Sequence, residues 1–455
     1  MNFQSINPYT SEVISKHDLH SETELLYILL NAEKTQQHWY KTKVSHRIQC
    51  LLKCSEQLLF YKSELAILIT QEMGKLLRES EAEIEKCALL CRYYAEHLEQ
   101  FLTPRKMYPD TTYYHEIRLD ALGVIFGIMP WNFPFWQVFR FAVPAIAAGN
   151  VVVVKHAHNV CGCGKAIENI FLQAGFEQGI FQNLFIKTED IEKVIAHPAV
   201  RAVSLTGSEQ AGKSVAALAG KYLKKTVLEL GSNDVFVVLK DADLLSAADE
   251  AAKSRLINNG QSCVAAKRFI VEESIYDEFV TYFENNVSKI TMGDPMKTTT
   301  SLGPLARLDL CQQLLKQVET SISLGAVAKK FDTNNHLGGA FMNPTILYQV
   351  PKPSPAYSEE LFGPVASVFK VKNGDEALNL ANDSVYGLAA SVWTSDEKNQ
   401  ILFSEQLQVG AIFFNAMVQS HPAMPFGGVK NAGYGRELGE YGLQEFVNIK
   451  TIKYN

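Results

Sequence analysis

The sequence contains no hydrophobic run long enough to cross a membrane. A spanning helix needs about 20 consecutive apolar residues, and the best candidate, residues 142–154, is interrupted by Pro144, Gly149 and Asn150. The N-terminal segment also lacks the apolar core of a signal peptide and the Arg-rich amphipathic pattern of an organellar presequence. We therefore expect a cytoplasmic protein.

An excess of basic charge is also missing. The 43 Lys and Arg residues against 49 Asp and Glu residues give a formal net charge of −6 and an isoelectric point near 6.0. Nucleic-acid-binding domains usually carry a basic patch, so we expect no nucleic-acid partner. The 455 residues, 47% of them hydrophobic and 20% charged, can bury a large core, which excludes a disordered or disulfide-stapled protein.

Cysteines are few, and their spacing does not indicate a metal site. Among the eight cysteines, Cys50 and Cys54 are four residues apart within a helical pattern, and Cys87 and Cys91 repeat this spacing. Each pair therefore shares one helix face, where buried thiols pack as small hydrophobes. The CGC motif at 161–163 has no second ligand pair at zinc-site spacing. We expect reduced thiols and no metal.

The sequence has neither internal repeats nor a Pro- or Gly-rich linker. Its first 100 or so residues show helical patterns: residues 21–24 form a capping box, Ser45 is a candidate cap for the next helix, and Gly74 is its candidate end. Beyond them, short apolar runs alternate with amphipathic stretches, which predicts an α/β fold with parallel sheets covered on both faces. Ligands bind such sheets at the carboxyl ends of the strands. The predicted strands are residues 122–128, 151–155, 202–206, 226–230, 234–239, 268–273 and 363–371.

One motif is typical of a phosphate-binding loop. Residues 207–214 match G-x-x-x-x-G-K-[ST] between a predicted strand and a predicted helix, and helix N-termini bind anions. Asp241, which follows the apolar run 234–239, is a candidate magnesium partner. The motif is compatible with a P-loop nucleoside triphosphatase, with an ordinary turn, or with a turn that holds the pyrophosphate of a dinucleotide. The sequence has no G-x-G-x-x-G fingerprint.

A second candidate site centres on Cys263. This residue lies in a polar, glycine-containing segment just before a predicted strand, where an accessible thiol can act as a nucleophile. Glu229 lies near the end of another predicted strand, where a carboxylate can serve as a general base. Asn132, in the turn at 130–134, offers an amide donor of the kind that an oxyanion hole requires. Taken singly, each residue also has a structural interpretation: a buried thiol, an exposed loop carboxylate and a turn-forming amide.

Eight segments spread along the chain form a further pattern. They are PWNFP (130–134), Lys155 after VVVV, LTGS (205–208), LELGSND (228–234), GQSC (260–263), EELFGP (359–364), PFGGVK (425–430) and GYGRE (433–437). Together these segments resemble the aldehyde dehydrogenase superfamily. The resemblance covers nearly the whole chain, in the family's order and spacing, and leaves the P-loop triphosphatase as a weaker alternative. Within the superfamily, the chain most resembles bacterial NAD(P)-dependent succinate-semialdehyde dehydrogenases.

The resemblance implies an architecture. It consists of two doubly wound parallel-sheet domains with a small β oligomerisation element. Residues 1–102 and 122–231 would form the dinucleotide-binding domain, and residues 232–432 the catalytic domain. Residues 103–121 and 445–455 would form the oligomerisation element. A homodimer or homotetramer is implied.

The resemblance also implies a mechanism. Cys263 would attack the aldehyde to form a thiohemiacetal and then a thioester, with Asn132 in the oxyanion hole and Glu229 activating the hydrolytic water. The cofactor would be NAD or NADP. His158 stands where many NAD-preferring relatives carry a Glu that binds the adenosine 2′-hydroxyl, so we expect NADP to be tolerated. The implied cofactor-binding positions are Trp131, Lys155, His158, Gly207, Ser208, Gly212, Glu360 and Phe362.

The substrate of that branch, succinate semialdehyde, carries a carboxylate that needs a cation or several donors. Arg140 matches a carboxylate-binding Arg of other semialdehyde dehydrogenases, although a salt bridge is an alternative role. Ile257 replaces a second Arg of those relatives, and Ser420 and His421 are candidates for the missing polar contacts. Besides the P-loop triphosphatase, two alternatives stay open: the same chemistry on another semialdehyde such as glutarate semialdehyde or on a broad aldehyde range, and a CoA-acylating reaction, against which Glu229 as a water-activating base argues.

Overall fold

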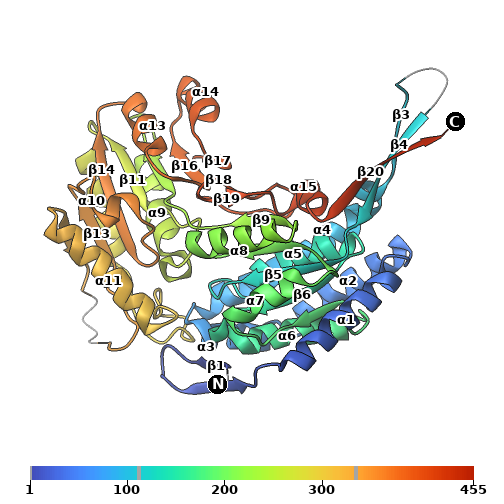
Figure 1. Ribbon diagram of the computed structural model, residues 1–455. Helices are drawn as coiled ribbons and strands as arrows, with labels where there is room; N and C mark the ends of the chain where they lie inside the picture. The colour runs from blue at the N-terminus through green and yellow to red at the C-terminus, as the bar shows by residue number, and fades with distance from the viewer. Residues whose placement is uncertain (1–2, 110–113, 333–336, 455) are drawn as a thin grey trace.

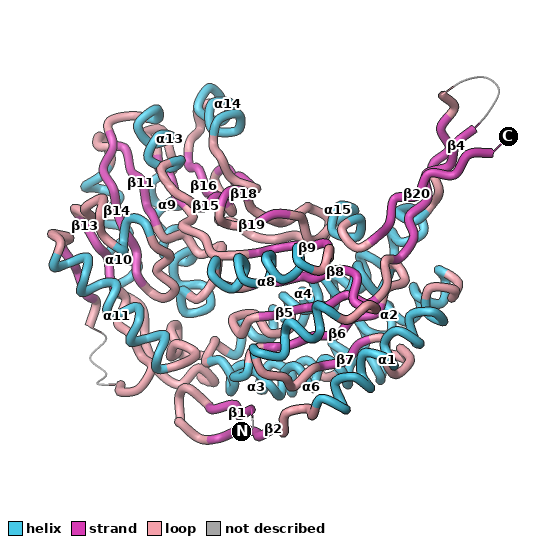
Figure 2. The backbone as a smooth tube through the Cα atoms, in the orientation of Figure 1, coloured by secondary structure: helices cyan, strands magenta, loops and turns pink. Residues whose placement is uncertain are grey.

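The computed structural model describes residues 3–109, 114–332 and 337–454 (Figure 1). Two large sheets lie side by side with helices around them, and a ribbon of antiparallel strands projects from the body (Figure 2). The predicted α/β class with parallel sheets is confirmed. All seven predicted strands are present, with ends that differ by at most two residues from those expected.

The first sheet has six strands in the order β19-β9-β8-β5-β6-β7. All neighbours are parallel except β19 and β9, which are antiparallel. Because β19 comes from near the end of the chain, the edge of this sheet is completed by a distant segment. The strands are β5 (Val124–Met129), β6 (Val151–His156), β7 (Phe181–Asn183), β8 (Val200–Thr206), β9 (Lys225–Glu229) and β19 (Gly433–Tyr434).

The N-terminal segment that precedes this sheet is mostly helical, as predicted, but three details differ. A strand pair, β1 (Phe3–Ile6) and β2 (Val13–His17), precedes the helices. The capping box of Ser21 and Glu24 is present, whereas Ser45 does not cap α2, because Lys43 holds that position. Gly74 ends a helix in left-handed backbone, but that helix is α3, and the single helix expected up to Gly74 is divided at Tyr61. The helices are α1 (Glu22–Trp39), α2 (Val44–Phe60), α3 (Lys62–Met73) and α4 (Leu77–Leu102).

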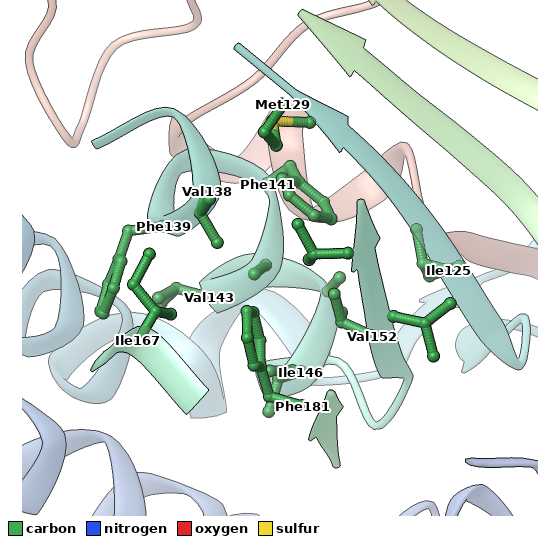
Figure 3. Close-up of a cluster of buried hydrophobic side chains, with 14 of the residues drawn as sticks. Ile125, Met129, Val138, Phe139, Phe141, Val143, Ile146, Val152, Ile167 and Phe181 are labelled. Carbon is green, nitrogen blue, oxygen red and sulfur yellow. The ribbon is translucent and has the colours of Figure 1, made fainter. Parts of the chain in front are cut away.

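Helix α5 (Trp136–Ala147) packs directly on the first sheet, and every one of its residues is buried (Figure 3). Phe141 of this helix lies over Gly127 of β5, where an added Cβ would lie 2.2 Å from the ring. Only glycine permits so close an approach. The other helices of this half are α6 (Cys161–Gln173), α7 (Ile191–Ala196) and α8 (Glu209–Lys221), with the short 3₁₀ helices η1 (His158–Val160) and η2 (Thr188–Asp190).

The second sheet has seven strands in the order β12-β13-β14-β11-β10-β16-β17, parallel except for β12. Alternate residues of β10 enter two separate hydrophobic clusters, so both faces of the sheet are buried. Its strands are β10 (Val235–Val238), β11 (Arg268–Glu272), β12 (Val327–Lys330), β13 (Thr345–Tyr348), β14 (Val365–Val371), β16 (Ala389–Trp393) and β17 (Ala411–Phe414). Its helices are α9 (Leu244–Leu256), α10 (Tyr276–Ser288), α11 (Leu308–Ser323), α12 (Pro355–Ser358), α13 (Gly374–Asn382) and α14 (Glu397–Gln406).

The projecting ribbon is a three-stranded antiparallel sheet in the order β20-β4-β3 (Figure 1). Its strands are β3 (Arg105–Met107), β4 (Tyr114–Ala121) and β20 (Val447–Tyr454), and α15 (Gly439–Gln444) leads into β20. These strands fall within the segments expected to form an oligomerisation element, of which residues 110–113 and 455 lie outside the described residues. A short pair, β15 (Tyr386–Gly387) and β18 (Val429–Lys430), lies between the two large sheets along the chain's return.

The eight cysteines form no disulfide. Within the described ranges, no cluster of three His, Cys, Asp or Glu side chains is placed to hold a metal ion. In that same part of the chain, no helix is both long enough and apolar enough to cross a membrane.

His156, at the end of β6, yields a prediction about stability. Its Nε2 donates to the carbonyl of Pro134 (2.8 Å), and its Nδ1 accepts from the backbone N–H of Ala157 (2.9 Å). Burial lowers the pKa of His156 to about 4. In the unfolded chain this histidine takes up a proton below its ordinary pKa near 6.5, whereas in the folded protein the ring stays neutral down to about pH 4. The folded state is therefore less stable relative to the unfolded state as the pH is lowered.

We expect a loss of about 2 kcal/mol from this residue between pH 7 and pH 5, measured by denaturant unfolding. The variant His156→Gln retains a donor toward Pro134 and does not titrate in this range. The free energy of unfolding of this variant should depend on pH less than that of the wild type, by the same amount. An unchanged pH dependence would contradict the role assigned to His156.

Candidate active site

The segment that leads to Cys263 is held in an unusual backbone conformation. Asn258, Asn259 and Gly260, in the 3₁₀ helix η3 (Ile257–Gly260), have φ angles of 56°, 57° and 76°, a region that asparagine and glycine tolerate best. The side-chain amide of Asn258 donates to the carbonyl of Asn132 (2.8 Å). The amide of Asn259 donates to carbonyls in the loops that follow α3 and precede α11 (2.9 and 3.0 Å). Side-chain hydrogen bonds thus compensate for the strained backbone.

Asn132 lies beside the nucleophile candidate with its side chain fixed. Its Oδ1 accepts from Nε2 of Gln137 (3.0 Å), and its Nδ2 donates to the carbonyl of Gln261 (3.0 Å). Since a primary amide carries two N–H groups, one hydrogen of Nδ2 is left for another acceptor. Asn132 and Cys263 line the same cleft. This arrangement supplies the donor that an oxyanion hole needs.

The Cys263 thiol stands where two clefts meet. It lines one cleft of about 550 Å³ and a second of about 280 Å³. Burial raises the pKa of the Cys263 thiol to about 12, while the nearby positive charges of Arg140 and Lys267 oppose that rise. The thiol is therefore protonated at neutral pH in this state, and a nucleophilic role requires removal of its proton.

Lys267 supports the backbone around the thiol. Its buried ammonium donates to the carbonyls of Ser262 (2.9 Å) and Cys263 (2.6 Å) and to the hydroxyl of Ser232 (2.9 Å). The Ser232 hydroxyl donates in turn to the carbonyl of Cys263. Lys267 also forms an ion pair with Glu360 at 3.2 Å. A single cation therefore connects the loop of the nucleophile with a carboxylate of the larger cleft.

Glu229 is buried at the end of β9 but lines neither of these two clefts. Its carboxylate packs against Gly427, where an added Cβ would lie 2.7 Å from Oε1. Burial and the neighbouring Glu437 raise the pKa of Glu229 well above its ordinary value, and Arg140 opposes them. The structure thus brings Asn132 and Cys263 together and leaves Glu229 outside the lining of these two clefts, with Glu437 as a neighbouring carboxylate.

The larger cleft opens at the carboxyl ends of β5, β8 and β9, the usual place for a ligand on a parallel sheet. Its walls include the rings of Trp131 and Phe362, which meet edge to face at 5.8 Å. Gly207 and Ser208 line it at the start of α8, and the Ser208 hydroxyl caps that helix. Glu360 lines it as well. These five predicted cofactor positions share one cleft, which fits the nicotinamide and phosphate parts of a dinucleotide.

Lys155 and His158 line a separate hollow of about 290 Å³. Lys187 adds a second ammonium there, and Phe3 of β1 forms part of the wall. Burial lowers the pKa values of Lys155 and His158. No carboxylate belongs to the described lining of this hollow. Its chemistry fits the adenosine end of a dinucleotide, and it favours an added negative charge.

Gly212 is explained by packing. It is buried in the first turns of α8, and an added Cβ would lie 2.5 Å from the side chain of Leu230. The glycine allows the helix to lie close to the segment that follows β9. It does not line the larger cleft, so the structure does not place it at the expected phosphate contact.

The P-loop triphosphatase interpretation is wrong. Lys213, which would have to bind phosphate, is 70% exposed and forms an ion pair with Glu209 of its own helix at 2.5 Å. The Ser214 hydroxyl donates to the backbone of the same helix (3.0 Å). Asp241, the candidate magnesium partner, follows a strand of the other sheet and is hydrogen-bonded by the loop after β16. The sequence motif is present, but the side chains that would have to bind phosphate and magnesium do not lie together.

The smaller cleft carries the other predicted side chains. Arg140 lines it, with its Nε 2.5 Å from Glu437 and its guanidinium 4.6 Å from the ring of Phe426. The salt bridge predicted as an alternative role for Arg140 is therefore present. Ser420 also lines this cleft, whereas His421 is exposed and its Nδ1 accepts from its own loop. Of the predicted substrate contacts, His421 is the one that the structure leaves outside.

Several residues that shape the site belong to no recognisable sequence motif. Gln137 orients Asn132, and Asn258 holds the loop of Cys263, but isolated amides give no signal in the sequence. Lys267, four residues after Cys263, could have been noted as a cation close to a candidate thiol. Lys86 of α4 also lines the smaller cleft, and its long separation from the other residues conceals it.

Comparison with known proteins shows the family to which the chain belongs. The aldehyde dehydrogenase family model matches residues 1–452, and the chain belongs to this family. A probable NADP(+) succinate-semialdehyde dehydrogenase of Synechocystis is 44% identical, with 99% of each chain covered. A succinate-semialdehyde dehydrogenase [NADP(+)] of Deinococcus radiodurans is 43% identical over 99% of this chain and 94% of its own. The crystal structure of succinic semialdehyde dehydrogenase from Streptococcus pyogenes with NADP+ has a TM-score of 0.96 and 36% identity, covering 99% of each chain.

The burial of Cys263 predicts its reactivity. Because its pKa is about 12 without cofactor, the alkylation rate by iodoacetamide should rise about tenfold per pH unit from pH 7 to 10 without a plateau. Removing a cation raises this pKa further, so Lys267→Met should lower the rate throughout. Mass mapping of the labelled Cys263 peptide gives the measurement, with Cys263→Ala as the blank. A plateau below pH 9 would contradict the assignment.

Proposed function

We propose that this enzyme oxidises succinate semialdehyde to succinate with NADP+ and water, in the cytoplasm. The observation that supports it most is the smaller cleft, which leads from the thiol of Cys263 to Arg140 and Ser420. Positive charge and a hydroxyl at the far end suit an aldehyde that carries a carboxylate. The succinate-semialdehyde dehydrogenases among the relatives give independent support.

Cys263 begins the reaction once its proton has been removed. The thiolate attacks the aldehyde carbon, and the new C–S bond leaves a negative charge on the former carbonyl oxygen. The free N–H of Asn132 and the backbone N–H of Cys263 stabilise this oxyanion. Gln137 keeps the donor in place by occupying the oxygen of the Asn132 amide.

Bound in the larger cleft, NADP+ would supply the acceptor for the hydride that the thiohemiacetal loses. Trp131 and Phe362 would flank the nicotinamide, and Glu360 would bind its ribose hydroxyls. The thioester that remains on Cys263 is then hydrolysed. We assign Glu229 to this step: its carboxylate turns from Glu437 toward the thioester and takes a proton from water, and its raised pKa makes it a stronger base.

The preference for NADP+ follows from charge. Lys155, His158 and Lys187 surround the hollow at the adenosine end. A 2′-phosphate there would meet two ammonium groups, and no carboxylate belongs to the described lining, which favours it over a free hydroxyl. The relatives with NADP(+) in their names agree with this assignment.

We further propose the division of labour expected from the sequence. Residues 1–102 and 122–231 bind the dinucleotide, and residues 232–432 carry the nucleophile. Residues 103–121 and 445–455 form a homo-oligomer contact. Exposed apolar side chains on the projecting ribbon support this last role, among them Met107 (52% exposed), Tyr108 (70%) and Ile449 (59%).

Reduced-nicotinamide formation with succinate semialdehyde tests the function. We expect activity with NADP+ to exceed that with NAD+ by at least about tenfold in kcat/KM, and Cys263→Ala to abolish both. The same assay with and without CoA examines the acylating alternative. Higher kcat/KM for glutarate semialdehyde or for neutral aldehydes would overturn the proposed substrate and leave the reaction class intact.

The role of Glu229 predicts a pre-steady-state burst. In Glu229→Gln the thioester should form but hydrolyse slowly, so one equivalent of reduced cofactor per active site appears before turnover falls roughly 100-fold or more. Stopped-flow absorbance at 340 nm measures the burst, and mass spectrometry detects the acyl group on Cys263. Loss of the burst together with turnover would assign Glu229 to an earlier step.

A further inference from the structure

Lys86 places a second cation in the smaller cleft. It lies on α4, seven residues after Glu79, and both side chains line this cleft. The ammonium donates to the hydroxyl of Ser420 (2.8 Å) and lies 4.5 Å from the centre of the Trp136 ring. Within the described part of the chain, no carboxylate lies within ion-pair distance of Lys86. A charged group is thus largely buried with only a hydroxyl and an aromatic face as partners.

The acids of the cleft do not neutralise this charge. Glu83 forms a buried ion pair with Lys75 at 2.5 Å, and its other oxygen accepts from the backbone N–H groups of Phe135 and Trp136. Glu79 accepts from the backbone N–H of the left-handed loop, and burial raises its pKa.

Arg140 differs from Lys86, because it is already paired with Glu437. An unpaired buried ammonium is costly, and burial together with Arg140 lowers the pKa of Lys86 to about 8. A substrate anion is the partner that this position lacks.

We propose that Lys86 is a specificity-determining residue, whose ammonium binds, together with the Ser420 hydroxyl, the carboxylate at the far end of the aldehyde substrate. This inference rests on the proposed function. It also accounts for Ile257: α4 supplies from another direction the cation that is missing from that position. Arg140, held by Glu437, then contributes its charge, and Lys86 supplies the uncompensated positive charge.

The test compares two four-carbon aldehydes, succinate semialdehyde and butanal. Charge-assisted hydrogen bonds carry enough energy for a roughly 10- to 100-fold effect. In Lys86→Met, kcat/KM for succinate semialdehyde should fall by that factor, while kcat/KM for butanal stays within about threefold. Lys86→Arg, which retains the charge, should recover much of the loss. Lys53→Met, on an exposed position of α2, is the matched control and should leave both substrates unchanged.

The pH dependence of the wild-type enzyme gives a second measurement that needs no variant. The ratio of the two kcat/KM values cancels groups that act on both substrates, such as Cys263 and Glu229. Lys86 is charged below its pKa of about 8, so the ratio should be high at pH 7 and fall above pH 8. The charged or titratable groups around it are Glu79, Glu83, Cys87, Arg140 and Cys263.

The outcomes separate the two proposals. The role of Lys86 is overturned if a folded Lys86→Met variant loses kcat/KM equally for both aldehydes. It is also overturned if the ratio of the two kcat/KM values still falls above pH 8 in this variant. Either result leaves the substrate assignment standing. A wild-type enzyme that does not favour succinate semialdehyde over butanal overturns the substrate assignment and the role of Lys86 with it. If Lys86→Met does not fold, a wild-type ratio that is flat between pH 7 and 10 also overturns the role.

Discussion

Three consecutive residues in left-handed backbone, Asn258 to Gly260, hold the nucleophile where the two clefts meet. The amide of Asn258 binds the backbone of Asn132, so the oxyanion donor and the thiol are set by one hydrogen-bonded unit. The amide of Asn259 ties the same loop to segments from both halves of the chain. Strained backbone of this kind persists only when its surroundings hold it, and such strain is concentrated at functional sites.

A second constraint is the return of the chain to the first sheet. Strand β19 pairs with β9 directly at Glu229, and a bridge between Phe426 and Glu437 closes the loop beside it. The returning segment brings Glu437 against Arg140 and Phe426 over its guanidinium. One edge of the dinucleotide-type sheet is thereby built from residues that follow the second sheet.

Buried charge is distributed unevenly around the thiol, and this distribution suits the reaction. Burial raises the pKa values of Cys263, Glu229 and Glu360 above their ordinary values. The positive charges of Lys267 and Arg140 oppose this rise at Cys263. Strongly shifted groups gathered in a cleft are typical of active sites. In a low-dielectric site the loss or gain of one ligand charge alters the pKa values of all these groups together.

The sequence alone determined the α/β class and seven strands of the two large sheets, and it singled out Asn132, Glu229 and Cys263 as candidates, because hydrophobic periodicity and compact motifs are local properties. Only the tertiary structure decided which side chains converge. The P-loop pattern at 207–214 failed because spacing does not show that Lys213 points to solvent. Ser45 failed as a cap because the helix began two residues earlier. Lys86 escaped notice because helix packing, across more than 300 residues of chain, is what brings it to Ser420.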